Sequence, residues 1–172
     1  MGNIRGQVLT LISYVIFYWS RFLKSKNALL ISEIIIKIIC IVAFIFLGST
    51  SGIINSIFGI ARNTTGIFVK NKNIKIKHIS LVLLLLLLTI IQFTQYEGIN
   101  TIFVYVCAVI NALGIIVLKE QGQRITGAIG GTFYFLFQIA IANWIGAICE
   151  LGTIISQLTS WFKYRKGTYN ND

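Results

Sequence analysis

Proline is absent from this sequence of 172 residues, and charged side chains are scarce. Without proline, none of its helices can carry a proline hinge. Charged residues make up 12% of the chain, against roughly 25% in soluble domains, whereas 56% of the residues are hydrophobic. This balance excludes an ordinary soluble domain and indicates an all-α integral membrane protein that crosses the bilayer several times.

The chain also lacks the side chains from which most active sites are built. It has one histidine, His78, which follows a basic segment, and its only aspartate is Asp172. No set of nucleophile, base and orienting group can be assembled from these residues, and no P-loop signature is present. We therefore expect neither an enzyme nor an ATP-driven protein, and no cofactor.

Metal and nucleic acid are two further ligands that the sequence does not favour. Cys40, Cys107 and Cys149 lie in three separate apolar runs, and no pair has the spacing of zinc ligands, so we interpret them as small buried hydrophobic residues. The net charge of +10 would suit a phosphate backbone. Its basic residues, however, lie between apolar runs and are not interleaved with aromatic side chains.

Seven apolar runs approach or reach the length of a membrane-spanning helix. A bilayer core of about 30 Å requires roughly 17–25 helical residues. The runs are 7–23, 28–47, 52–70, 79–96, 101–118, 125–142 and 143–162. The segment "ANWIG" must form a tight turn between the last two.

The connecting segments alternate in charge, which predicts the orientation of the chain. Basic residues follow the first, third, fifth and seventh runs, whereas Arg5 is the basic residue on the opposite side. Positive charge stays on the cytoplasmic side, so we expect the amino terminus outside and the carboxyl terminus inside. The basic residues assigned to the cytoplasmic side are Arg21, Lys24, Lys26, Lys70, Lys72, Lys75, Lys77, Lys119, Arg124, Lys163, Arg165 and Lys166.

An internal repeat is indicated when the sequence is shifted by 95 residues, because the charged connecting segments then coincide. We expect seven transmembrane helices arranged as two parallel three-helix bundles joined by a linker helix, a 3+1+3 plan. The first bundle covers 1–78, the linker helix 79–98, and the second bundle with a short basic tail 99–172. Parallel repeats about an axis along the membrane normal are a known transporter plan.

Two stretches carry a resemblance to a known family. The segments "FIFLGSTSGIINSIFGIARNTTGIF" and "NWIGAICELGTIISQLTSWFKYRK" resemble the YgjV-type bacterial inner-membrane proteins. Those proteins are in turn similar to the SWEET sugar transporters and the PnuC vitamin transporters, which are built as three helices, one linker helix and three helices. The resemblance covers roughly residues 20–166 and implies a transporter fold in the inner membrane of a bacterium.

Polar residues recur on one face of two predicted helices. Asn55, Gly59, Arg62 and Gly66 follow one another at helical spacing, and so do Gly146, Glu150, Thr153 and Gln157. The shift of 95 places Asn55 on Glu150, so both faces should line one central cavity. We predict that Arg62 and Glu150 bind solute there. The alternative is that Arg62 snorkels to the surface or only holds helices together.

Four further residues complete the predicted site. Glu33 and Lys37 are four residues apart with the acid first, the better order for a helical ion pair inside the membrane. Asn111, near the middle of its run, can bind a solute or a neighbouring helix. Trp144, at the start of the last run, forms either part of an interfacial aromatic belt or the outer wall of the cavity.

The function favoured by these patterns is a carrier of a small polar solute that works by alternating access. The alternative is a multi-span membrane protein that does not transport and acts as an assembly or regulatory partner, and a channel is a weaker third choice. The expected partners are the lipid bilayer and a small polar solute, and a homo-oligomer is compatible with the sequence.

Overall fold

The computed structural model describes residues 3–20, 26–69, 71–118 and 120–165 of the chain. Over these residues the chain forms seven α-helices and no strand, as the seven apolar runs predicted. The helices are α1 (Ile4–Ser20), α2 (Lys26–Leu47), α3 (Thr50–Val69), α4 (Ile74–Thr94), α5 (Ile99–Ile116), α6 (Glu120–Ala140) and α7 (Trp144–Arg165).

Two helices begin five residues before their apolar runs, whereas the others begin within three residues of theirs. Helix α4 begins at Ile74 and α6 at Glu120, so Lys75, Lys77 and Arg124 lie on helices rather than in loops. Lysine, glutamine and glutamate are good helix formers and no proline stops the helix, so each charged first turn continues it beyond the apolar run. For eight of the basic residues that the sequence assigned to the cytoplasmic side, the residue or its side chain lies outside the part of the chain that the structure describes. They are Arg21, Lys24, Lys26, Lys70, Lys119, Lys163, Arg165 and Lys166.

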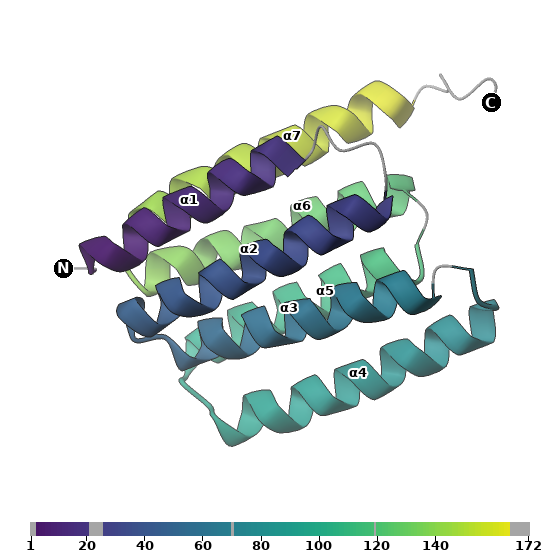
Figure 1. The fold of residues 1–172 in the computed structure, drawn as a ribbon, viewed down its shortest axis with the longest axis horizontal. Coiled ribbons are helices and arrows are strands. Elements are labelled where there is room, and N and C mark those ends of the chain that lie inside the picture. The colour runs from purple at the N-terminus through teal and green to yellow at the C-terminus, as the bar shows by residue number, and fades with distance from the viewer. Residues whose placement is uncertain (1–2, 21–25, 70, 119, 166–172) are drawn as a thin grey trace.

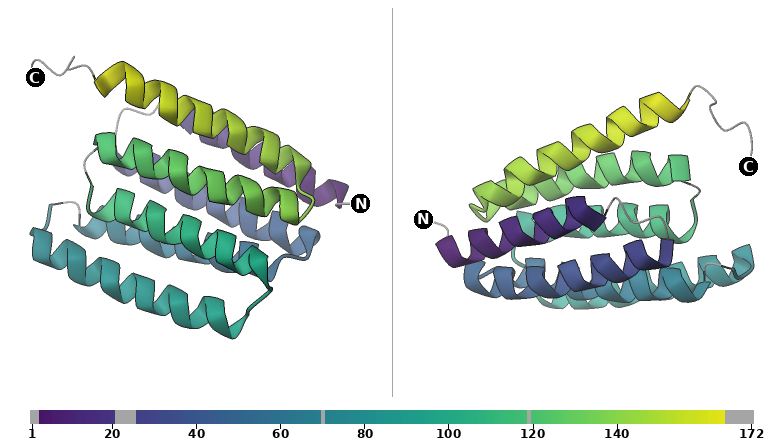
Figure 2. Two further views of the ribbon diagram at one scale, coloured as in Figure 1. Left: turned by 180° about the vertical axis from the view of Figure 1, so that it is seen from behind. Right: turned by 45° about the horizontal axis from the view of Figure 1, so that its top comes forward.

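Six of the seven helices in the described part form a closed ring of neighbours. Helix α1 packs on α2, α2 on α3, α3 on α5, α5 on α6, α6 on α7, and α7 on α1. Figure 1 shows α1, α2 and α3 in front of α7, α6 and α5, and the views of Figure 2 agree. Helix α4 lies outside the ring, against α3 and α5.

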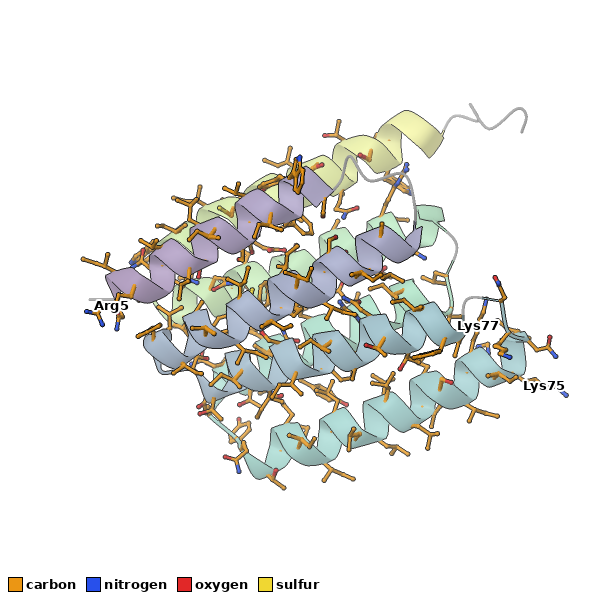
Figure 3. All side chains as sticks on the ribbon, viewed as in Figure 1. Arg5, Lys75 and Lys77 are labelled. Atoms are coloured by element: carbon orange, nitrogen blue, oxygen red, sulfur yellow. The ribbon has the colours of Figure 1, made fainter. Side chains whose placement is uncertain are left out.

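Consecutive helices run in opposite directions, so α1, α3, α5 and α7 all begin at one end of the molecule (Figure 1). We call this end the N-terminal end. Figure 3 shows Arg5 there, whereas Lys75 and Lys77 lie at the opposite end, which we call the basic end. Charge therefore separates along the direction of the helices, with the apolar helix bodies between the two ends.

Three hydrogen bonds stabilise the turn between α2 and α3. The backbone N–H of Ser49 donates to the carbonyl of Phe44, and that of Gly48 to the carbonyl of Ile45. This is a Schellman ending, and Gly48 takes the left-handed conformation that it requires, with φ of 68°. The side chain of Ser49 then caps α3 by accepting from the N–H of Gly52 at 3.2 Å.

The turn between α6 and α7, predicted as a tight turn at "ANWIG", repeats these bonds. The N–H of Asn143 donates to Gln138, that of Ala142 to Ile139, and the Asn143 side chain accepts from Gly146 at 3.2 Å. Each of these residues lies 94 positions after its counterpart, as in 48 + 94 = 142. Ala142 has φ of 55°, a left-handed conformation that disfavours a side chain.

The apolar surface of the bundle is divided between core and exterior. On α4, Leu81, Leu84 and Leu88 are buried against the ring, whereas Leu83 and Leu87 are exposed on the other face. In water such a face would be a large apolar patch. In a bilayer it faces lipid at no cost.

Three helices are long and apolar enough to cross a membrane by length and composition, namely Leu30–Leu47, Ile74–Thr94 and Ile99–Ile116. The other four depart from this pattern for local reasons. Helix α1 has 17 residues, and α3 carries polar side chains such as Asn55 and Arg62, both of which are buried inside the bundle. Their polarity faces the interior rather than the exterior.

Candidate functional site

A cavity of about 510 Å³ lies inside the ring of six helices. Helix α4 contributes nothing to its lining. Six residues that the sequence predicted as site residues all line this cavity: Glu33, Lys37, Asn55, Arg62, Asn111 and Glu150. The helical faces of α3 and α7 thus meet around one volume, and its size falls within the range of small-molecule pockets.

Trp144 does not belong to this site, which differs from its prediction as a solute-binding residue. It is the first residue of α7, its side chain is 56% exposed, and it is not part of the cavity lining. The turn at Ala142 places it at the outer edge of the bundle. This position suits an aromatic belt at the membrane interface.

Arg62 is held by a short chain of hydrogen bonds on the α2–α3 side. Its Nε donates to Oδ1 of Asn63 at 3.3 Å, and Nδ2 of Asn63 donates to Oε2 of Glu33 at 3.1 Å. Asn63 is fully buried and Arg62 is 8% exposed. The carboxylate of Glu33 attracts the guanidinium of Arg62, so the two charges compensate each other inside the bundle.

Lys37 reaches across the cavity instead of pairing within its own helix. Its Nζ lies 5.6 Å from the centre of the Tyr134 ring on α6, within the range of a cation–π contact. Its methylene groups pass over Gly59 on α3, where an added Cβ would lie 3.0 Å from Cε. The sequence predicted a Glu33–Lys37 ion pair, whereas the structure gives Glu33 the amide of Asn63 and Lys37 the ring of Tyr134.

Glu150 lines the cavity from α7, the last helix that the structure describes. Its Oε2 accepts a hydrogen bond from the Tyr14 hydroxyl on α1, with 2.5 Å between the oxygen atoms. Its Oε1 lies against α6, where an added Cβ on Gly131 would be 2.9 Å away. The side chain is 8% exposed, and it is attracted electrostatically by Lys37.

Sequence reasoning missed the contribution of α1 and the aromatic wall. Thr10, Tyr14 and Phe17 line the cavity from α1, and Tyr134 lines it from α6. The spacing of the first three, 4 and then 3 residues, is that of one helical face. Their run was predicted from its apolar residues alone, and this polar–aromatic stripe is the signal that could have identified it.

The N-terminal end of the cavity is closed by packed side chains. Thr10, Phe44 and Gln138 line the cavity and are each at most 3% exposed. The Phe44 ring from α2 lies 5.9 Å from that of Phe137 on α6. Behind them, Nδ2 of the fully buried Asn143 donates to Thr10 and to Gln138. These contacts join α1, α2, α6 and the α6–α7 turn.

The opposite, basic end of the cavity is less tightly packed. Besides the buried Leu30, its lining includes half-buried polar and aromatic side chains near the ends of α1 and α7 and near the beginnings of α2 and α6. These residues are Phe17, Glu33, Gln123, Arg124 and Gln157. The cavity is therefore sealed toward the N-terminal end and more accessible toward the basic end.

Neither metal nor covalent chemistry is suggested by this lining. Within the described part of the chain, no group of three or more His, Cys, Asp or Glu side chains could hold a metal ion. Cys40 and Cys107 line the cavity as free thiols. The arrangement provides opposite charges, hydrogen-bonding groups and aromatic rings around one cavity, and such groups can bind a small polar molecule.

Comparison with known proteins identifies one relationship. The profile of the Imp-YgjV family, described as bacterial inner membrane protein, matches residues 4–168. No curated protein and no solved structure matches the chain significantly. The match covers all seven helices that the structure describes.

Proposed function

The chain belongs to the Imp-YgjV family of bacterial inner membrane proteins, and we propose that it works there as a carrier of a small polar solute by alternating access. The observation that carries this proposal is the cavity inside the helix bundle, which is lined by Glu33, Lys37, Arg62 and Glu150. Ionisable residues inside a membrane are costly and mark solute pathways when they face a cavity.

The proposed mechanism rests on a 3+1+3 plan in which α1–α3 and α5–α7 are repeats and α4 is the linker. Corresponding helices begin at Ile4 and Ile99, at Lys26 and Glu120, and at Thr50 and Trp144, offsets of 95, 94 and 94. A two-fold axis along the helices would exchange α1 with α5, α2 with α6 and α3 with α7, which agrees with the ring of contacts.

The matched turns refine the register that this repeat proposal requires. Because their hydrogen bonds correspond at an offset of 94, Asn55 corresponds to Cys149 rather than to Glu150. Lys37 corresponds to Gly131 in the same register. In this register the proposed repeats share the geometry of these two turns, but their cavity charges do not correspond: Glu33 and Lys37 lie on α2 and Arg62 on α3, whereas Glu150 lies on α7.

We further propose that all seven helices cross the membrane, with the amino terminus outside and the carboxyl terminus in the cytoplasm. The segregation of Arg5 from Lys75 and Lys77 to opposite ends (Figure 3) supports this orientation. A reporter fused after Asp172 should be active only if it is a cytoplasmic reporter. Activity of a periplasmic reporter there contradicts the orientation.

In the proposed carrier, Arg62 and Glu150 line the solute pathway and no step is enzymatic or ATP-driven. Arg62 is fixed through Nε, and its Nη1 and Nη2 make no hydrogen bond to any residue that the structure describes. Those two donors suit a bidentate contact with a polar group of the solute. Asn55 and Asn111 provide amide groups on α3 and α5.

The proposal is tested by flux in proteoliposomes that contain the full chain and are screened with labelled polar solutes. Arg62→Ala should abolish uptake of the transported solute while membrane abundance stays close to normal. Arg5→Ala, which removes an exposed basic residue at the N-terminal end, is the matched control and should leave uptake unchanged. If uptake and abundance fall together, Arg62 only holds helices together. If no solute moves in the unmodified protein, an assembly or regulatory role replaces the carrier.

A further inference from the structure

We infer that Lys37 and Glu150 together form a binding site for a zwitterionic solute, one that carries a carboxylate and an ammonium group. This inference rests on the proposed carrier function and names the class of its substrate. In this site Lys37 receives the carboxylate of the solute, while Glu150 and the ring of Tyr134 receive its ammonium group.

The first argument is that the two charges approach the same volume from opposite halves of the chain. Lys37 comes from α2 and crosses Gly59 of α3, and Glu150 comes from α7 and lies against Gly131 of α6. In both cases a glycine on the neighbouring helix provides the space that the charged side chain occupies. Small residues at such positions allow close approach between helices, and here each glycine leaves room for a charged side chain of the neighbouring helix.

The second argument concerns the groups that surround this pair. Tyr134 presents its ring to the ammonium of Lys37 at 5.6 Å, and the hydroxyl of Tyr14 donates to Oε2 of Glu150. An aromatic face beside a carboxylate is suited to an ammonium group. In the structure the Nζ of Lys37 occupies that position. The flexible stem of a lysine lets Nζ move to the solute carboxylate once a solute ammonium takes its place.

The third argument is charge balance in a medium of low dielectric constant. Glu33 and Arg62 already compensate each other's charge through Asn63, and Lys37 and Glu150 form a second pair of opposite charges, which the two charged groups of a solute can engage. Nη1 and Nη2 of Arg62 can at the same time donate to a neutral polar group of that solute. A solute with a single charge would leave Lys37 or Glu150 uncompensated, which is costly in the interior. When a zwitterion binds, the attraction between Lys37 and Glu150 is replaced by one contact of each residue with the solute. The solute adds no net charge to the cavity.

The fourth argument links the site to movement of the two halves. Helices α2 and α7 belong to different proposed repeats, and they are not neighbours in the ring of helices that the structure describes. A solute that contacts Lys37 and Glu150 at once therefore draws together elements that the fold leaves apart. A charged group on one half alone would bind solute without favouring closure of the cavity.

The test measures binding to the full chain in lipid nanodiscs by its effect on the thermal unfolding midpoint. The probes are the standard amino acids, glucose and glycerol, together with matched sets such as L-alanine, propionate and ethylamine. At least one zwitterion should bind, and its deaminated acid and decarboxylated amine should bind about tenfold or more weakly. Tightest binding of glucose, glycerol, an acid or an amine overturns the inference and leaves the carrier standing. Binding of no probe overturns both.

Two single variants provide a readout that a structural role would not change. Lys37→Met retains Glu150 and should reverse the preference within a matched set, so that the amine binds more tightly than the zwitterion. Glu150→Gln should shift the preference toward the acid. Lys75→Met, at the exposed basic end, is the control and should bind as the unmodified protein does. Weaker binding without a change of preferred class contradicts the assignment.

The double variant Lys37→Met with Glu150→Met keeps the proposal testable if the single variants do not fold. It removes both charges and so leaves no unpaired one in the interior. We expect it to fold and to have lost zwitterion binding. Zwitterion binding by the folded double variant, with unchanged affinity, overturns the inference.

Discussion

The hydroxyl of Tyr14 and the carboxylate of Glu150 lie 2.5 Å apart and join the first helix to the last. This bond closes the ring of helices between α1 and α7. Two further bonds support the same interface, one from Tyr18 to the carbonyl of Cys149 and one from Asn143 to Thr10. The contact with Glu150 differs from these because its acceptor is the carboxylate of a buried side chain.

Tyr14→Phe should therefore lower the stability of the bundle. It removes the hydroxyl without changing the ring and leaves one oxygen of Glu150 without its donor. Hydrogen bonds to charged groups are among the stronger ones, and we expect a loss of about 1–2 kcal/mol, within the range seen inside membranes. The measurement is the thermal unfolding midpoint in nanodiscs.

Tyr18→Phe is the matched control for that change, since it lies one helical turn further along α1. Its hydroxyl donates to a backbone carbonyl at 2.9 Å from an exposed position, so the loss should be about 0.5 kcal/mol. Equal losses of stability in the two variants, or a larger loss for Tyr18→Phe, would show that the bond to Glu150 stabilises the bundle no more than an exposed hydrogen bond does.

Gly131→Ala should displace Glu150, whereas Gly127→Ala on the same helix should be tolerated. The added Cβ would lie 2.9 Å from Oε1 of Glu150 and 3.0 Å from Cγ1 of Ile154 at position 131, but 3.3 Å from the amide of Gln157 at position 127. Both variants gain helix propensity. The crowding at Gly131 should make its variant less stable than the Gly127 variant by about 1–2 kcal/mol. The comparison of their unfolding midpoints isolates crowding from propensity, and equal midpoints contradict it.

Much of the fold follows from periodicity and charge. Seven apolar runs predicted seven helices, and helical spacing placed Asn55, Arg62 and Glu150 on faces that the structure brings to one cavity. Such spacing is a local property of a helix. The α6–α7 turn was likewise predicted at "ANWIG", because this segment lies at the boundary between the last two apolar runs.

The partners of the charged residues could not be predicted in the same way. Sequence favours neighbours within one helix, so Lys37 was assigned to Glu33, four residues before it. In the structure Gly59 of a different helix opens a path from Lys37 to Tyr134. That path depends on how α2, α3 and α6 pack together, so it cannot be predicted from the spacing of residues within one helix. Tyr14 was missed for the same reason, since its partner is 136 residues away.

Glu97 makes a contact outside the spanning segments that should depend on pH. Its carboxylate accepts from the N–H groups of Thr50 and Ser51 and from the Ser51 hydroxyl, at 3.1, 3.0 and 2.7 Å. It thereby caps the N-terminus of α3 from the loop before α5. Burial raises the pKa of Glu97, but the hydrogen bonds from Ser51 and Thr50 outweigh burial and lower it.

A lowered pKa in the folded state means that the ionised form of Glu97 stabilises the fold. The contribution is complete above about pH 4.3, the ordinary pKa of glutamate, and is lost as the pH falls through the lowered value. Glu97→Gln should cost about 0.5–1 kcal/mol at neutral pH and progressively less in acid. Other carboxylates titrate alike in both proteins, so the difference between the two unfolding midpoints isolates Glu97. A difference that is constant with pH contradicts the assignment.

Cys40 provides a test of which end of the cavity is accessible. It lines the cavity and is half-buried, while Phe44, one turn toward the N-terminal end, is 2% exposed and packs on Phe137. In a variant that retains Cys40 alone, a small membrane-impermeant thiol reagent should react in inside-out vesicles and not in intact cells, because the basic end faces the cytoplasm in the proposed orientation.

A variant that retains Cys149 alone is the control: this thiol is half-buried but does not line the cavity, so it should remain unmodified from both sides. Faster reaction of Cys40 in intact cells would show either that the cavity opens toward the N-terminal end or that the orientation is reversed, and a cytoplasmic reporter after Asp172 distinguishes the two.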